Sequence, residues 1–258
     1  MKFSDTHCHL YLSDFENDIS IVIRRARDAG VIACYLPNID SSSIGDMLRL
    51  EAGYPGYCHA MMGLHPCSVK ENYRKELALV NDWLNKRPFA AVGEIGLDFH
   101  WDKTFVPQQY EAFRQQIGWA REIQLPIVIH SRDSTQECID VVKENQDGNL
   151  KGIFHCFTGS YESALQIIDL GFYLGIGGVL TYKNSGLAEI ISKIDLKHIV
   201  LETDAPYLTP VPFRGKRNES AYLKYVLKKL SEIKNMPASE IADITTENSN
   251  MIFNTKSV

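Results

Sequence analysis

The sequence predicts an α/β protein, a single (β/α)8 barrel of the TIM type with C-terminal helices. Eight short segments rich in β-branched and aromatic residues are spread through the 258 residues, and helical patterns lie between them. Several segments are almost continuously apolar, as parallel strands buried on both faces are. The length allows one barrel or two modest domains. Since no linker or internal repeat interrupts the chain, we expect one domain over residues 1–258.

The strand candidates are bounded by polar residues, glycine or proline. In chain order they are Lys2–Thr6, Val31–Leu36, Tyr57–Gly63, Phe89–Ile95, Pro126–His130, Gly152–Phe157, Phe172–Gly177 and His198–Glu202.

Helices are expected between these strands. One follows the first strand and stops at Gly30, and another begins near Pro107 after the fourth strand. A third spans about Ser160–Gly171, and Glu219–Lys234 and Ala238–Ile252 complete the chain. Strands alternating with helices in this way favour a barrel with parallel strands.

Composition narrows the class of protein. Apolar residues make up 45%, charged residues 23%, and the net charge is −5, so a strongly basic nucleic-acid coat is excluded. No apolar run resembles a signal peptide or reaches about 18 residues, so we expect a cytoplasmic protein, monomeric and free of membrane. The six cysteines form no CxxC pair and are expected to be free thiols, with Cys8 packed in the core.

Six possible metal ligands lie at or just after the C-terminal ends of strand candidates. Barrel enzymes place their chemistry on this face. Imidazole nitrogens and carboxylate oxygens are suitable ligands for a divalent metal. The six are His7, His9, Glu94, His130, His155 and Asp204.

Spacing suggests how these ligands divide. His7 and His9 stand at i and i+2, so both imidazoles can reach one ion. Glu94 carries two oxygens and could bridge two cations roughly 3.5–4 Å apart. His130 and His155 could each be a core histidine if alone, but together at neighbouring strand ends they favour a second metal position.

The two acids at and just after the end of the last strand candidate, Glu202 and Asp204, have different possible roles. Asp204 could bind the first metal and accept a proton from the attacking water, which would make it catalytic together with Glu94. Glu202 could support the ligands or bind metal, and a salt bridge or a helix-terminus contact is equally compatible with its position.

Three further residues are candidates for substrate binding. His65 in GLHP could contact a phosphate or support the ligands, although it could also be an ordinary loop residue. Arg214 and Arg217 belong to RGKRN, in which three cations and a glycine suit phosphate oxygens. A basic cluster in isolation is usually solvated surface, so the metal site is what favours phosphate binding here.

These motifs together resemble the TatD family of metal-dependent deoxyribonucleases, among the amidohydrolase-like metal hydrolases. The resemblance covers nearly the whole chain, and its specificity comes from eight motifs in the family's order. They are DTHCHL, GLHP, VGEIGLD, IHSRD, FHCFTGS, LETDAPYL, PFRGKRNES and TTENSNMIF. Ser220 departs from the family, which commonly has proline there.

The resemblance implies a (β/α)8 barrel with two divalent ions, whose identity (Mg²⁺, Mn²⁺ or Zn²⁺) it leaves open. One ion would be held by His7, His9, Glu94 and Asp204, and the other by Glu94, His130 and His155. The implied activity is hydrolysis of DNA phosphodiesters, with 3′-to-5′ exonuclease action on single strands or ends.

Two other functions are compatible with the motifs. The first is an amidohydrolase acting on a small cyclic amide or an ester, because that chemistry shares the histidine and aspartate ligands. Many such enzymes bridge their metals with a modified lysine, whereas Glu94 stands at that place here. The second is a non-catalytic member of a nucleoprotein assembly, but structural zinc sites are usually closed and four-coordinate.

Overall fold

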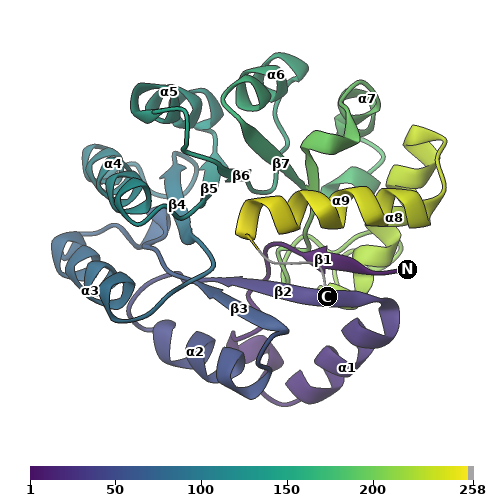
Figure 1. The fold of residues 1–258 in the computed structure, drawn as a ribbon, viewed down its shortest axis with the longest axis horizontal. Helices are drawn as coiled ribbons and strands as arrows, with labels where there is room; N and C mark the ends of the chain where they lie inside the picture. Colours follow the sequence, from purple (N-terminus) through teal and green to yellow (C-terminus); the bar gives the residue numbers. More distant parts are fainter. Residues whose placement is uncertain (255–258) are drawn as a thin grey trace.

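Figure 1 shows a computed structural model of the protein, which describes residues 1–254. Its strands are β1 (Phe3–Asp5), β2 (Val31–Pro37), β3 (Cys58–Met61), β4 (Val92–Asp98), β5 (Ile127–Arg132), β6 (Gly152–Phe154), β7 (Phe172–Ile176) and β8 (Ile199–Leu201). Its α-helices are α1 (Ile19–Ala29), α2 (Ile44–Gly53), α3 (Tyr73–Lys86), α4 (Val106–Glu122), α5 (Thr135–Asn145), α6 (Tyr161–Asp169), α7 (Leu187–Ser192), α8 (Leu223–Lys234) and α9 (Ala238–Phe253).

The strands pair in parallel in two sheets, ordered β1-β2-β3 and β4-β5-β6-β7-β8. Backbone hydrogen bonds join the sheets at both seams. Between β3 and β4, the Gly93 amide donates to the carbonyl of Met62 at 3.0 Å, and between β1 and β8 the Thr6 amide donates to that of Leu201 at 3.0 Å. Helices surround the strands (Figure 1), so the expected TIM-type barrel is confirmed.

All eight strand candidates overlap a strand, but β2, β4 and β5 extend beyond their predicted ends, and one of these boundaries affects the site. The fourth was expected to end at Ile95, whereas β4 runs from Val92 to Asp98. Gly96 and Leu97 continue the pairing with β5 after a register shift between Val92 and Ile95. The side chain of Glu94 therefore projects from within a strand and not from its end.

The helices agree less completely with the sequence analysis. The helices α2, α3, α5 and α7 carry no prediction of their own. A short 3-10 turn, Ser220–Tyr222, precedes α8, which begins at Leu223 and not at Glu219. The C-terminal helix extends one residue beyond the predicted end.

Helix α9 closes the amino-terminal end of the barrel, and it lies in front of the strands in Figure 1. Its last buried residues, Ile252 and Phe253, pack against barrel residues that include Tyr35, Val128 and Val200. The rings of Tyr35 and Phe253 stack with centroids 3.8 Å apart. The opposite end, where the strands have their carboxyl termini, is left for chemistry.

All six cysteines are free thiols, as the sequence predicts. Cys8 is completely buried, and its thiol donates to the carbonyl of Tyr35 at 3.6 Å, which confirms its expected packing role. Within residues 1–254, no helix combines the length and the apolar character that a membrane span requires.

We expect Ile252→Ala to lower the free energy of unfolding by about 2–5 kcal/mol, because it leaves a cavity where α9 plugs the barrel. The adjacent Met251→Ala is the matched control, since Met251 is 48% exposed and the loss there should stay within about 0.5 kcal/mol. Urea denaturation followed by circular dichroism measures both values. Equal losses in the two variants would contradict the packing of α9 described above.

Candidate metal centre

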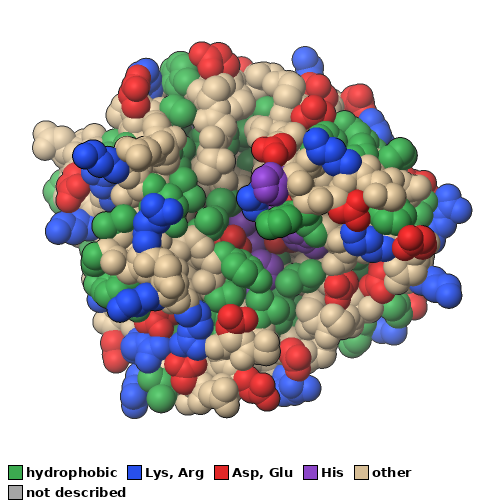
Figure 2. All heavy atoms as spheres, turned by 180° about the vertical axis from the view of Figure 1, so that it is seen from behind, with side chains coloured by type: hydrophobic (Ala, Val, Ile, Leu, Met, Phe, Trp, Pro, Cys, Tyr) green, Lys and Arg blue, Asp and Glu red, His purple; other side chains and the backbone are tan. Residues whose placement is uncertain are grey.

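The histidines gather in a hollow on the face opposite α9. Figure 2 views this face and shows imidazoles at the bottom of a central depression, framed largely by hydrophobic side chains. His7 is fully buried, and His9 and His155 are each 4% exposed. Three ligand candidates from distant parts of the chain therefore meet at the carboxyl ends of the strands.

Glu94 lies at the centre of this cluster with only 2% of its surface exposed. One carboxylate oxygen, Oε2, lies 3.2 Å from Nε2 of His7 and 3.6 Å from Nε2 of His9. The other oxygen, Oε1, lies 2.9 Å from Nδ1 of His130 and 3.2 Å from Nε2 of His155. Each oxygen thus faces a different pair of imidazoles, which is the arrangement that a bridging carboxylate needs.

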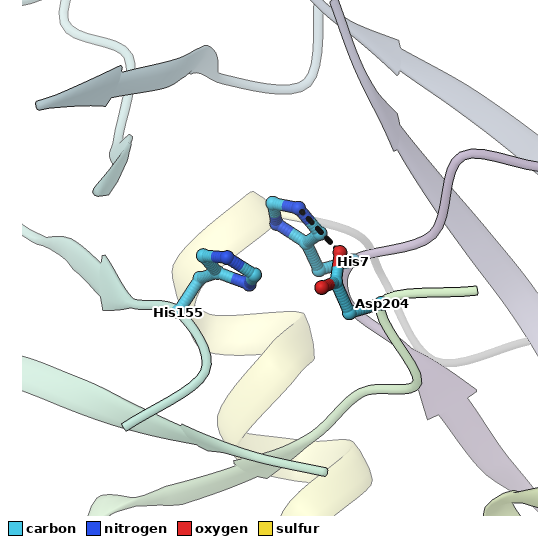
Figure 3. A group of neighbouring side chains, drawn as sticks. All are labelled: His7, His155 and Asp204. Atoms are coloured by element: carbon cyan, nitrogen blue, oxygen red, sulfur yellow. Dashed lines mark ion pairs between the residues drawn. The ribbon is translucent and has the colours of Figure 1, made fainter. Parts of the chain in front are cut away.

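Asp204 completes the first of these two groups. Its Oδ1 lies 3.7 Å from Nε2 of His7 and 3.6 Å from Nε2 of His9. Figure 3 shows the aspartate pointing toward His7, with the ring of His155 next to that of His7. The rings of His7 and His155 stack with centroids 3.7 Å apart.

Three sets of side chains have ligand atoms within 4.8 Å of one another. They are His7 with His155 and Asp204, His7 with His9 and Glu94, and His65 with Glu94 and His130. The six predicted ligands are thus brought together, and His65 joins them.

Most of these imidazoles are oriented by a second polar partner. Nδ1 of His9 lies 2.9 Å from the hydroxyl of Tyr11, which donates to the carbonyl of Pro37. Nε2 of His130 lies 2.9 Å from Oδ2 of Asp98. Such outer partners fix the ring orientation and raise the basicity of a metal-ligating histidine.

His155 is held in the same way by Glu202. Nδ1 of His155 lies 3.2 Å from Oε1 of Glu202, which also accepts a hydrogen bond from the amide of Cys156. Glu202 is 1% exposed and supports His155 from behind. Of the roles that its sequence position allowed, the geometry favours support of a ligand.

The donor set fits a divalent metal. Both ring nitrogens of His7 are buried, and neither makes a hydrogen bond with any described residue. An unpaired polar atom in the interior is costly, so an imidazole in this state requires another partner. Metal coordination would supply it, because nitrogen and carboxylate oxygen together suit zinc and also accept other divalent ions.

Asp5, the last residue of β1, joins the segment that carries His7 to the segment that carries Asp204. It accepts hydrogen bonds from the amide of Thr203 at 2.9 Å, the Thr203 hydroxyl at 2.6 Å and the Ser220 hydroxyl at 2.6 Å. Burial raises the pKa of Asp5 to about 6, although these hydrogen bonds oppose the shift. The Asp204 amide also donates to the His7 carbonyl at 2.9 Å, so this seam fixes the spacing of two ligands.

The charges of the cluster are strongly interdependent. Burial opposes the negative charge of Glu94, but its interactions with the surrounding imidazoles, that of His155 foremost, prevail and hold the pKa of this carboxyl well below its usual range. Burial also opposes a positive charge on His155, yet Glu94 and Glu202 raise the pKa of its imidazole well above the usual value. Burial and the charge of His155 instead lower the pKa of His7.

The three predicted substrate-binding residues have different surroundings. His65 Nε2 lies 3.2 Å from Nδ1 of His130 and 3.5 Å from Oε1 of Glu94, so this residue is part of the cluster. Arg214 is exposed, and its guanidinium lies 4.2 Å from the ring centroid of Tyr182.

Arg217 is engaged within the protein. Its guanidinium donates to both carboxylate oxygens of Asp18, at 2.8 and 2.7 Å, and lies 4.6 Å from the ring centroid of Phe15. This pairing fixes the RGKRN segment against the start of α1. Of the two arginines, Arg214 is therefore the one whose guanidinium has no carboxylate within ion-pair distance among the described residues.

The sequence analysis missed Asp98 and Tyr11 as parts of the site. Asp98 is 1% exposed and accepts hydrogen bonds from the amides of His100 and Trp101 while it faces His130. The motif GLD contained a signal, because an acid at a strand end on this face is a candidate in any barrel enzyme. Tyr11 gave no such signal, since its role depends on its distance from His9.

Comparisons with known proteins show which family the chain belongs to. Residues 4–254 match the family model described as TatD related DNase. A Bacillus subtilis (strain 168) protein, named uncharacterized metal-dependent hydrolase YabD, is 40% identical over 96% of this chain and 98% of its own length. The chain belongs to the TatD family.

Solved structures of TatD proteins have the same fold. YjjV, a TatD homologue from Escherichia coli K12, aligns with a TM-score of 0.92 and 31% identity over 98% of both chains. A hydrolase of the TatD family from Entamoeba histolytica aligns with a TM-score of 0.83 and 21% identity over 99% of both chains, which bears on the fold alone. As a TatD protein, this chain is a hydrolase that depends on a divalent metal.

Metal binding to this TatD site should release protons. Burial opposes a proton on His130, but hydrogen bonds and charges from Asp98 and Glu94 raise its pKa, and Glu94 and Glu202 raise the pKa of His155, so these two imidazoles bind protons more tightly than a free histidine when no metal is present. A metal needs the neutral imidazole. Calorimetric titration with Zn²⁺ or Mn²⁺ in buffers of different ionisation enthalpy should show release of about one proton or more, with affinity rising from pH 6 to pH 8. Affinity independent of pH would contradict this charge distribution.

Asp98→Asn should weaken metal binding by about 10–100-fold, because it removes the negative charge that orients His130. The matched control is Asp133→Asn on the same face, whose carboxylate is 64% exposed and lies 3.0 Å from His100. The metal affinity of both variants is measured by competition with a chelating dye. Unchanged affinity in Asp98→Asn would remove Asp98 from the site.

Proposed function

We propose that this TatD protein is a deoxyribonuclease that hydrolyses DNA phosphodiester bonds with two divalent ions, as a 3′-to-5′ exonuclease. The observation that carries the proposal is the position of Glu94, whose two oxygens face separate imidazole pairs at the bottom of an open hollow. Two-metal sites with ions about 3.5–4 Å apart are typical of enzymes that cleave phosphate esters.

The ligand assignment follows the two faces of Glu94. On the Oε2 side, His7, His9 and Asp204 would hold one ion, and on the Oε1 side, His130 and His155 would hold the other. Mg²⁺, Mn²⁺ and Zn²⁺ are all compatible with these donors. When bound, such ions lower the pKa of water and neutralise charge that develops on the phosphate and the leaving group.

The residues of the chain have distinct tasks in this reaction. Asp204 is 16% exposed at its side chain, against 2% for Glu94, so it is the acid that an incoming water reaches first. Burial and the nearby Glu94 raise the pKa of Asp204, although His155 and His9 oppose the shift, and this tendency suits an acceptor of the proton from the attacking water. His65 and Arg214 would hold phosphate oxygens, and Arg217, paired with Asp18, fixes the loop that carries Arg214.

Access to the site favours a flexible strand over a duplex. The Glu94 carboxylate is almost completely enclosed, so a scissile phosphate must enter the hollow to reach it. A single strand or a frayed end can do so, whereas the phosphates of an intact duplex are held at its perimeter. The overall negative charge of −5 also favours binding at an end over tracking along DNA.

Glu94→Gln should reduce DNA hydrolysis by about 10³-fold or more, because one oxygen of the bridge is replaced by an amide that does not bind metal well. The measurement uses end-labelled single-stranded DNA, with metal-free protein and with Mg²⁺, Mn²⁺ or Zn²⁺ restored. We expect a ladder that shortens from the 3′ end only when metal is present.

Glu111→Gln is the control for this experiment, since Glu111 is 51% exposed on α4 and pairs with Arg74. It should cut DNA at the wild-type rate. Full activity in Glu94→Gln would contradict the bridging role. Intact DNA under every metal, with hydrolysis of a cyclic amide or lactone instead, would replace the nuclease by the small-molecule hydrolase.

A further inference from the structure

We infer that Trp101 and Arg132 form a stacking platform at the edge of the metal centre, which holds a nucleobase of the DNA strand being cut. The inference rests on the proposed function and assigns a subsite to it. It starts from a side chain whose position the metal chemistry does not explain.

Trp101 is 69% exposed, although tryptophan is usually well buried. It belongs to the segment that follows β4, on the same face as the metal ligands. An exposed indole offers a flat apolar surface, and on a catalytic face such a surface is a candidate contact for a ligand.

The backbone of Trp101 is fixed to the metal centre through one carboxylate. Oδ1 of Asp98 accepts hydrogen bonds from the amides of His100 at 2.9 Å and Trp101 at 3.0 Å, and Oδ2 faces His130 at 2.9 Å. The Phe99 amide also donates to the carbonyl of Arg132 at 2.9 Å. The indole therefore stands at a defined place beside a proposed metal ligand.

Arg132 ends β5, two residues after His130, and its guanidinium lies 5.2 Å from the ring centroid of Trp101. Its own charge has no acidic partner within 4 Å among the residues that the structure describes. Carboxylates of the same two loops are paired with other groups: Asp98 with His130, Asp102 with Lys70, and Asp133 with His100. The guanidinium thus remains available to a phosphate next to the stacked base.

A nucleotide of a single strand fits both groups, because its base can stack on the indole of Trp101 while its phosphate pairs with the guanidinium of Arg132. Aromatic side chains beside cations are the usual contacts of single-stranded nucleic acid, because every base has a flat π-face and lies next to a phosphate. The platform is sequence-tolerant for the same reason. A small cyclic amide would have no need for the arginine.

The first test compares Trp101→Ala with wild type on two substrates. One is single-stranded oligo(dT), and the other is an oligonucleotide of abasic tetrahydrofuran units with the same phosphates. Loss of stacking should lower kcat/KM on oligo(dT) about 10-fold and leave the abasic substrate within about twofold. Trp83→Phe is the matched control, because Lys86 lies over that indole at 5.3 Å on α3, outside the site.

The second test needs no turnover. Phosphorothioate-linked oligo(dT) is added to metal-loaded protein, and tryptophan fluorescence is recorded. The chain has three tryptophans, so quenching that persists in Trp83→Phe and disappears in Trp101→Phe would assign the contact to Trp101.

The outcomes separate the platform from the nuclease activity. Suppose that wild type cuts DNA, and that in Trp101→Ala the value of kcat/KM either falls equally on both substrates or does not fall. The platform is then wrong and the proposed function stands. If oligo(dT) quenches Trp101 but no DNA is cut, the platform stands and the proposed function fails. If oligo(dT) does not quench Trp101 and no DNA is cut, both the platform and the proposed function are overturned.

Discussion

The burial of the Glu94 carboxylate is the constraint on which the catalytic face depends. An enclosed negative charge is unfavourable unless opposite charges or a metal compensate it. Five imidazoles, those of His7, His9, His65, His130 and His155, lie within 3.6 Å of its two oxygens. They come from β5 and from the segments that follow β1, β3 and β6, so the barrel must bring these strands together before the charge can be accommodated. Fold and site are therefore coupled through one side chain.

The rest of the molecule keeps these groups in place. Asp5 connects β1 to the segment after β8 at the seam of the barrel, and Asp98 and Glu202 hold imidazoles from behind. Helix α9 fills the opposite end, so that the hollow opens on one face only. Burying a polar centre is unfavourable, and the hydrogen bonds around it and the large apolar core below it compensate for this free energy.

The sequence predicts the strands, and it predicts the side chains that gather around Glu94, because both are local patterns. The apolar run before each ligand marks a strand, and a ligand such as His130 lies near the end of that strand, two positions before β5 ends at Arg132. The end of β4 was misplaced, since Gly96 resembles a strand terminator and only its pairing with β5 shows that the strand continues. Partners distant in sequence could not be predicted, as for Arg217, which meets Asp18 across 199 positions. Tyr11 is only two residues from His9, but its role depends on the loop conformation that brings its hydroxyl to Nδ1 of that histidine.

The most direct test of the account is the number and position of the metal ions. Crystals grown with Mn²⁺ or Zn²⁺ would give anomalous diffraction peaks at the ions themselves. The account predicts two peaks roughly 3.5–4 Å apart, one on each side of the Glu94 carboxylate, with His7 and His9 at one and His130 and His155 at the other. A single peak, or two peaks of which neither contacts Glu94, would contradict it.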